Sequence, residues 1–111
     1  MTPIHYQDFY LLLERPDQDA IAFFSSPRCG ACRRLAHKIK EEDIHTPIFL
    51  IYAEDAPGII EEFSIFHLPT LLVFRQGEPH CTLDIDWIES LQKQIDNALM
   101  RPPQENLCFK D

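Results

Sequence analysis

Two cysteines separated by two residues, Cys29 and Cys32, are the side chains whose types and spacing most directly suggest chemistry. A cysteine thiolate is a nucleophile toward disulfides and a ligand for soft metal ions, so the pair could exchange disulfides or help to hold a metal. An apolar run at 20–24 leads into the pair, and an amphipathic helical pattern leaves it. Two cysteines three positions apart at the start of a helix can form a disulfide with little backbone movement.

The helical pattern predicts different surroundings for the two sulfurs. Cys32, Leu35 and Ile39 recur at the helical period within a helix expected at about 29–42, whereas Cys29 lies off this apolar stripe. At a helix N-terminus, unpaired N–H groups and the helix dipole favour a negatively charged sulfur. We therefore predict an exposed Cys29 with a lowered pKa that attacks first, and a shielded Cys32 that reacts second. Two inert, buried cysteines are the structural alternative.

The charge of the chain is unevenly distributed. The net charge of -8 disfavours general nucleic-acid binding. The stretch 28–40 contains no acidic residue and carries +5, so the other residues carry -13 to reach the total of -8. This stretch is either a solvated helix face or a local positive field that favours a thiolate and selects partners. Its basic residues are Arg28, Arg33, Arg34, Lys38 and Lys40.

A metal site is the other use of paired cysteines. Tetrahedral zinc needs four ligands, typically with a second closely spaced pair. Cys81 and Cys108 are isolated and far apart in the sequence, and His37 is expected off the face that holds Cys32. We therefore expect no metal and no other cofactor. Cys81 is expected to pack within a strand and Cys108 to be a free thiol in the tail, because a disulfide between them is not favoured in a reducing compartment.

The length of 111 residues predicts a single domain, expected at 1–101, followed by a C-terminal tail at 102–111. No apolar run approaches the roughly 20 residues that span a bilayer, so no membrane association is expected. The N-terminus lacks a basic segment followed by an apolar stretch, which indicates a cytoplasmic location rather than secretion. We expect a monomer that does not bind nucleic acid.

Periodicity along the chain predicts alternating helices and strands. Strand–helix–strand connections followed by a hairpin at 76–79 are typical of an α/β fold, here a mixed sheet of four to five strands with helices on both faces. The expected strands are 4–5, 20–24, 48–53, 71–75 and 80–85. The expected helices are 6–14, 29–42, a short one capped by Asp55 that holds Ile59, Ile60 and Phe63, and one from Ile88 to Leu99 with a capping box at Asp86 and Glu89.

Together these features resemble the thioredoxin family over about residues 4–100. A Cys-x-x-Cys pair followed downstream by Leu-Pro-Thr at the entry to an apolar strand is a specific combination. The resemblance implies the thioredoxin fold. The motifs that carry it, in the family's order, are the run 20–24, Cys29-Gly30-Ala31-Cys32, Leu68-Pro69-Thr70, the strand 71–74 and the turn 76–78.

The resemblance implies a thiol–disulfide oxidoreductase that reduces protein disulfides with electrons from a reductase or another thiol donor. Cys29 would attack and Cys32 would resolve the mixed disulfide. Pro69 would be cis and face the disulfide, and Leu68 would offer backbone groups to an extended substrate segment. His67 could titrate near this site or simply face solvent. The residues expected to bind substrate are Arg28, Gly30, Ala31, His67, Leu68 and Pro69.

The chain also departs from the family's pattern. Arg28 stands where thioredoxin has tryptophan, and the dipeptide between the cysteines is Gly-Ala rather than Gly-Pro. Phe23 replaces the buried aspartate, and Ile51 or Tyr52 lies near the place of its lysine partner. The glycine expected near the last hairpin is not evident. These departures favour a specialised member, and they sustain an alternative in which the chain is a non-catalytic binding module or assembly chaperone.

Overall fold

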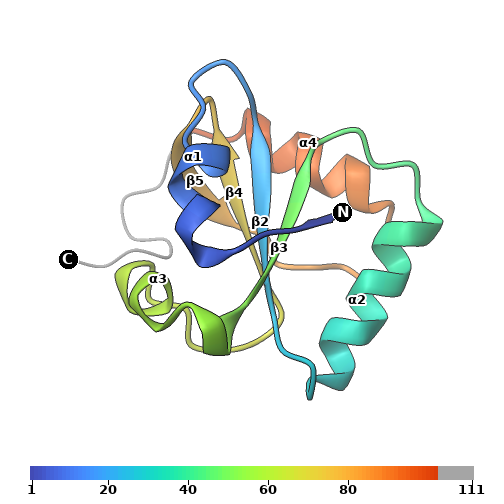
Figure 1. Cartoon of the computed structure of the whole chain (residues 1–111). Helices are drawn as coiled ribbons and strands as arrows, with labels where there is room; N and C mark the ends of the chain where they lie inside the picture. Colours follow the sequence, from blue (N-terminus) through green and yellow to red (C-terminus); the bar gives the residue numbers. More distant parts are fainter. Residues whose placement is uncertain (103–111) are drawn as a thin grey trace.

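A computed structural model describes residues 1–102, which form a five-stranded sheet in the order β1-β3-β2-β4-β5 (Figure 1). The strands β1, β3 and β2 are parallel, and β4 and β5 are antiparallel to their neighbours. This arrangement confirms the expected mixed sheet of the thioredoxin fold. The strands are β1 (Thr2–Pro3), β2 (Ala20–Ser25), β3 (Ile48–Tyr52), β4 (Thr70–Arg75) and β5 (Glu78–Thr82). The helices are η1 (Tyr6–Asp8), α1 (Phe9–Leu13), α2 (Gly30–Glu41), η2 (Ala53–Asp55), α3 (Pro57–Glu62) and α4 (Leu91–Met100).

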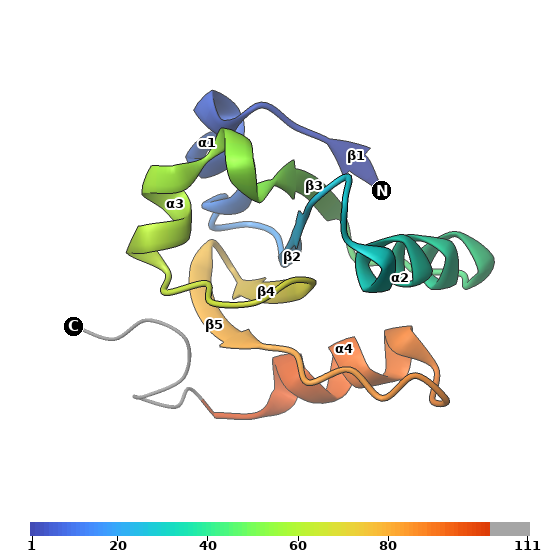
Figure 2. The same cartoon turned by 90° about the horizontal axis from the view of Figure 1, so that it is seen from below.

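The central strand β2 is buried on both faces, which explains its unbroken apolar sequence. Ala22 and Phe24 face a cluster with residues of α1 and α3, whereas Ile21 and Phe23 face a cluster with residues of α2 and α4. Figure 2 shows these two pairs of helices on opposite sides of the sheet. The sheet therefore separates two apolar layers, and α2 begins at the edge where β2 ends.

The first part of the chain differs from the expectation. The edge strand is Thr2–Pro3 rather than 4–5, and the first helix divides into the 3₁₀ turn η1 and the short helix α1. Asp55 does not cap α3, because it lies in η2 and the N-cap position is Ala56, which makes no side-chain cap bond. A second 3₁₀ turn thus occupies the position predicted for a helix cap.

The last part of the chain also differs. The capping box at Asp86 and Glu89 is wrong, because the side chain of Ser90 accepts the hydrogen bond from the Lys93 N–H and α4 begins at Leu91. Ile88, expected inside the helix, is 95% exposed in the preceding segment. The strand expected at 80–85 begins earlier and ends earlier, as β5. Of the tail expected at 102–111, only Pro102 lies within the described residues, and Cys108 lies outside them.

No helix within residues 1–102 is both long enough and apolar enough to cross a membrane.

Candidate functional site

The sheet topology brings the cysteine pair and the Pro69 loop to one edge. Phe24 near the end of β2 pairs with Thr70 at the start of the antiparallel strand β4, so the loops beyond both residues leave from the same edge. The peptide bond between Leu68 and Pro69 is cis, which confirms that expectation. Leu68 packs against the same apolar cluster as Cys29. Two segments 40 positions apart in the sequence thus meet beside the cysteines.

The two cysteines occupy different positions at the start of α2. Cys29 is the N-cap residue, and its sulfur accepts a hydrogen bond from the Cys32 N–H at 3.1 Å. Cys29 and Cys32 are joined by a disulfide, with Cα atoms 5.2 Å apart. Cys32 is 1% exposed and belongs to the apolar cluster with Leu35 and Ile39, whereas Cys29 is partly exposed. Cys29 is therefore the more solvent-accessible of the two residues.

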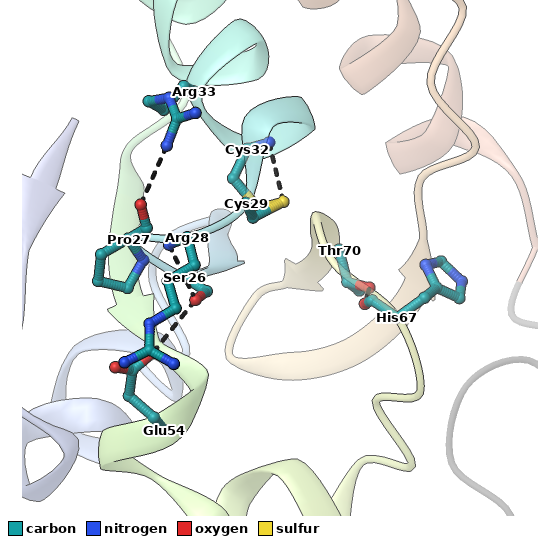
Figure 3. Close-up of a disulfide and its surroundings, with 9 residues drawn as sticks. All are labelled: Ser26, Pro27, Arg28, Cys29, Cys32, Arg33, Glu54, His67 and Thr70. Atoms are coloured by element: carbon teal, nitrogen blue, oxygen red, sulfur yellow. Dashed lines mark hydrogen bonds between the residues drawn. A yellow bond between two sulfur atoms is a disulfide. The ribbon is translucent and has the colours of Figure 1, made fainter.

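The loop that leads into Cys29 is fixed by polar contacts (Figure 3). The Ser26 hydroxyl accepts from the Arg28 N–H at 3.3 Å and donates to the Glu54 carboxylate at 3.2 Å. The Arg33 guanidinium donates to the Pro27 carbonyl at 3.0 Å. These contacts hold the backbone on both sides of Pro27 and so orient the loop that presents Cys29.

The side chains predicted to bind substrate are only partly brought together. Gly30 is exposed and Ala31 half-buried in the first turn of α2, beside the sulfurs. The Arg28 side chain is exposed, and Figure 3 shows it directed away from the two cysteines. The exposed His67 ring also points away from them, while the His67 carbonyl accepts from the Thr70 hydroxyl at 2.7 Å. His67 thus lies at the site through its backbone rather than its imidazole.

The surroundings of Cys32 contain no carboxylic acid among the buried residues of 1–102, whose only polar members are Ser25, Thr70 and His80. Phe23 is fully buried in the same cluster as Cys32. On the parallel strand β3, the neighbour of Phe23 is Leu50 rather than Ile51 or Tyr52. An apolar pair therefore stands where the family's pattern has an aspartate and a lysine.

The remaining thiol of the described chain, Cys81, is buried and free. Burial raises the pKa of Cys81, and this effect is opposed by the Arg101 guanidinium, which lies 3.8 Å from the sulfur. No group of three or more His, Cys, Asp or Glu side chains within residues 1–102 is placed to hold a metal ion. Cys81 packs within β5, as its position in the sequence suggests.

Two residues that shape the site were missed by sequence reasoning. Ser26 and Glu54 fix the cysteine loop, yet they lie 28 positions apart, and neither belongs to a local pattern that predicts the contact. The sequence gives one signal for this contact: Ser26 directly follows β2, and Glu54 lies two residues after the end of β3, a parallel strand. Such residues meet at one edge of a parallel sheet, so the neighbouring ends of β2 and β3 could have suggested the pair.

Comparisons with known proteins point to one family. The family model described as Thioredoxin matches residues 1–97. Thioredoxin domain-containing protein 2 of Rattus norvegicus is 29% identical over 96 residues, which cover 80% of this chain and 17% of that protein. The M-type chloroplastic thioredoxin of Spinacia oleracea is 31% identical over 77 residues, covering 66% of this chain and 41% of that protein. The thioredoxin of Porphyra purpurea is 30% identical over 66 residues, covering 56% of this chain and 62% of that protein. The chain thus spans less than two thirds of each of these relatives.

Proposed function

This chain belongs to the thioredoxin family, and we propose that it is a thiol–disulfide oxidoreductase that reduces disulfides in partner proteins. The observation that carries the proposal is the position of Cys29 as the N-cap of α2, with its sulfur accepting the Cys32 N–H. A thiolate is a stronger hydrogen-bond acceptor than a thiol, and the helix N-terminus favours its charge. The same geometry would therefore lower the pKa of Cys29 in the reduced protein.

Reduction would proceed by two thiol–disulfide exchanges. The Cys29 thiolate attacks one sulfur of the partner's disulfide, which breaks that bond, forms a mixed disulfide and releases the partner's other sulfur as a thiolate. Cys32 then loses its proton and attacks the Cys29 sulfur. This second exchange forms the Cys29–Cys32 disulfide and releases the second thiolate of the partner. Two electrons pass to the partner, and an external thiol or reductase returns the pair to its dithiol form.

The substrate segment would bind between the start of α2 and the Pro69 loop. Leu68 would offer backbone groups to an extended segment, since its side chain is held by the apolar clusters on both faces of the sheet. Gly30 and Ala31 present little side-chain bulk at the other side of this space. We further propose that the protein acts as a monomer in the cytoplasm and needs no cofactor beyond its thiol donor.

An insulin-reduction assay with a thiol donor tests the proposal. Aggregation of the released insulin chain should be faster with the protein than with the donor alone. Cys81→Ser, which leaves both proposed site cysteines in place, should reduce insulin as fast as the unaltered protein. No turnover above the donor alone would reject the enzyme. It would instead favour the binding-module or chaperone alternative. Phe23, which stands in place of the family's buried aspartate, is consistent with that alternative.

A further inference from the structure

A groove of about 720 Å³ runs along α2, between this helix and Trp87. It begins at Gly30, next to Cys29, and ends at the last turn of α2. The segment that leads into α4 passes beside α2 and supplies the facing wall (Figure 2). A groove of this size can hold several side chains of a bound peptide. Its lining residues are Gly30, Arg33, Arg34, His37, Lys38, Glu41, Glu42 and Trp87.

The charges in the groove are separated along its length. At the far end, Lys38 pairs with Glu42 at 2.8 Å, and the exposed His37 ring lies 3.1 Å from Glu41. At the end near the cysteines, no carboxylate within residues 1–102 forms an ion pair with Arg33 or Arg34. The two guanidinium groups near Gly30 therefore have no carboxylate partner among residues 1–102, in a chain whose total charge is -8.

The facing wall is aromatic and held in place. The Arg34 guanidinium lies over the Trp87 ring, 5.6 Å from its centroid, and the Trp87 side chain stays 43% exposed. The Lys38 ammonium donates to the carbonyls of Trp87 and Glu89 at 3.1 and 3.0 Å, which fixes this segment against α2. The wall thus needs little reorganisation to receive a ligand, which reduces the entropic cost of binding.

We propose that this groove binds an acidic segment of the protein substrate, next to the disulfide that Cys29 attacks. Asp or Glu carboxylates of that segment would lie against Arg33 and Arg34, because guanidinium groups bind carboxylates through paired, charge-assisted hydrogen bonds. Apolar parts of the segment would pack on Trp87 and the exposed Ile88. The inference rests on the proposed function, and it names the class of substrate that the enzyme selects.

Trp87 provides a direct probe, since it is the single tryptophan of the chain. The Cys29→Ser/Cys32→Ser variant lacks both cysteines of the proposed site, so binding is measured without exchange at this pair. We titrate it with a glutamate-rich peptide and with the same peptide carrying glutamine or lysine instead. The glutamate peptide should change Trp87 fluorescence in a saturable manner that added salt weakens. The glutamine and lysine peptides should bind roughly tenfold or more weakly, since they lack the carboxylates that would pair with Arg33 and Arg34.

Two charge-reversal variants distinguish peptide binding in the groove from a general effect of the protein's net charge. Arg34→Glu in the same background should weaken the glutamate peptide roughly tenfold, measured by the anisotropy of a labelled peptide. Arg75→Glu changes the net charge equally at an exposed site outside this groove, and it should leave the affinity unchanged. Equal weakening by both variants would overturn the proposal. So would stronger binding of a single-stranded RNA than of the peptide, or a fluorescence change caused by self-association.

The peptide-binding test of the groove and the insulin-reduction test of the enzyme can fail independently of each other. Insulin reduction by the unaltered protein together with no preference for the glutamate peptide would reject the groove alone. Saturable peptide binding together with no insulin reduction would reject the enzyme and leave the groove as the recognition surface of a binding module. With both activities present, Arg34→Glu should slow reduction of a disulfide peptide flanked by glutamates. Arg75→Glu, which lies outside the groove, should reduce the same peptide at the rate of the unaltered protein.

Discussion

Cys29 is the N-cap residue of α2, is partly exposed and has a second sulfur within bonding distance. In the reduced protein, we expect Cys29 to be alkylated at a lower pH than in the unfolded chain. We also expect it to react at least about tenfold faster than Cys32 near neutral pH, because Cys32 is buried. Iodoacetamide labelling followed by peptide mass spectrometry gives each rate separately.

Two controls make this alkylation measurement specific. Arg28→Glu should raise the pKa of Cys29 only slightly, because the Arg28 side chain is exposed and directed away from the sulfurs. Cys81 should react slowly until the protein unfolds, since it is buried and burial raises its pKa. If Cys32 is labelled before Cys29, or if folding does not change the pH at which Cys29 reacts, the assignment of the nucleophile is wrong.

Among residues 1–102 no acid is buried near Cys32, and this should affect the second exchange. Phe23 cannot accept the proton that Cys32 must lose, so water or a distant histidine would take it. We expect the mixed disulfide to resolve with a rate that rises steeply between about pH 6 and about pH 8. Stopped-flow release of a fluorescent peptide from the mixed disulfide measures this step. Fast resolution that is independent of pH over the same range would show that another group accepts the proton.

At the residue scale, the sequence predicted contacts that are local and missed those that are not. The Cys29–Cys32 pair follows from its spacing, and the cis bond before Pro69 is implied by the family resemblance; both occur in the structure. The Ser26–Glu54 hydrogen bond joins residues from two different loops, so no spacing rule reveals it. The directions of exposed side chains, such as the His67 ring, were also inaccessible, because they depend on the loop conformation.

The C-terminal end of α2 is linked to the beginning of α4 through one carboxylate. An acid is disfavoured by the dipole at a helix C-terminus, which made Glu42 difficult to explain from the sequence. In the structure, Glu42 pairs with Lys38 and accepts the Leu91 N–H at 2.6 Å, so it compensates an unpaired donor in the first turn of α4. Glu42 therefore acts as a cap supplied by one helix to another.

This link has a measurable pH dependence. Burial opposes ionisation of Glu42, but hydrogen bonds from Lys38 and Leu91 together lower its pKa. A carboxyl group with a lowered pKa stabilises the folded state above its unfolded pKa of about 4, and this stability is lost as the pH falls further. Glu42→Ala should cost about 1 kcal/mol at pH 7, as is usual for the loss of a cap. Urea unfolding should show this cost shrinking at about pH 3.

Glu41 supplies the matched control for this prediction. It is exposed at the neighbouring position of α2 and pairs only with His37 at the surface. Glu41→Ala should change the urea midpoint little, because exposed ion pairs contribute little to stability. A cost for Glu42→Ala that is the same at both pH values, or equal to that of Glu41→Ala, would contradict the capping role.

A second link connects α1 with α3 on the other face of the sheet. The Tyr10 hydroxyl donates to the Glu62 carboxylate, and partial burial together with this bond raises the pKa of Tyr10 to about 12. A raised pKa means that the folded state keeps its proton longer, so the associated stability is lost as the pH rises from about 10 to about 12. Tyr10→Phe should remove part of this alkaline loss in urea unfolding. An identical alkaline slope in both proteins would show that Tyr10 does not contribute.

The elements themselves were predictable where one apolar pattern determined them. The buried strand β2 and the stripe of α2 follow directly from period and length. The start of α4 was not predictable in this way, because the apolar residues Trp87 and Ile88 extend the helical pattern to positions before the first residue of the helix, Leu91. These two side chains line or flank the α2 groove instead. Exposed apolar residues at a binding surface and buried ones in a helix look the same in a sequence.

For the molecule as a whole, the fold separates stability from reactivity. The two apolar layers lie on opposite faces of the sheet, and the cysteine pair lies at the edge where β2 meets α2. The basic stretch 28–40 begins at this edge and continues along α2, while the other residues carry -13. A partner that approaches the cysteines therefore meets positive charge first, which should increase the association rate of acidic partners at low ionic strength.

Cysteine variants test whether the whole molecule works as a two-step reductase. Cys32→Ser keeps the first exchange and removes the second, so it should accumulate mixed disulfides with partner proteins that dithiothreitol releases. Cys29→Ser should neither reduce insulin nor trap partners, because Cys32 is buried. Cys81 and Cys108 are present in both variants, so complexes formed only by Cys32→Ser must involve Cys29. Non-reducing electrophoresis after incubation with cell extract, followed by mass spectrometry, identifies the trapped chains. Equal trapping by both variants would place the reactive thiol elsewhere, and trapping by neither would favour a binding module whose cysteines take no part in exchange.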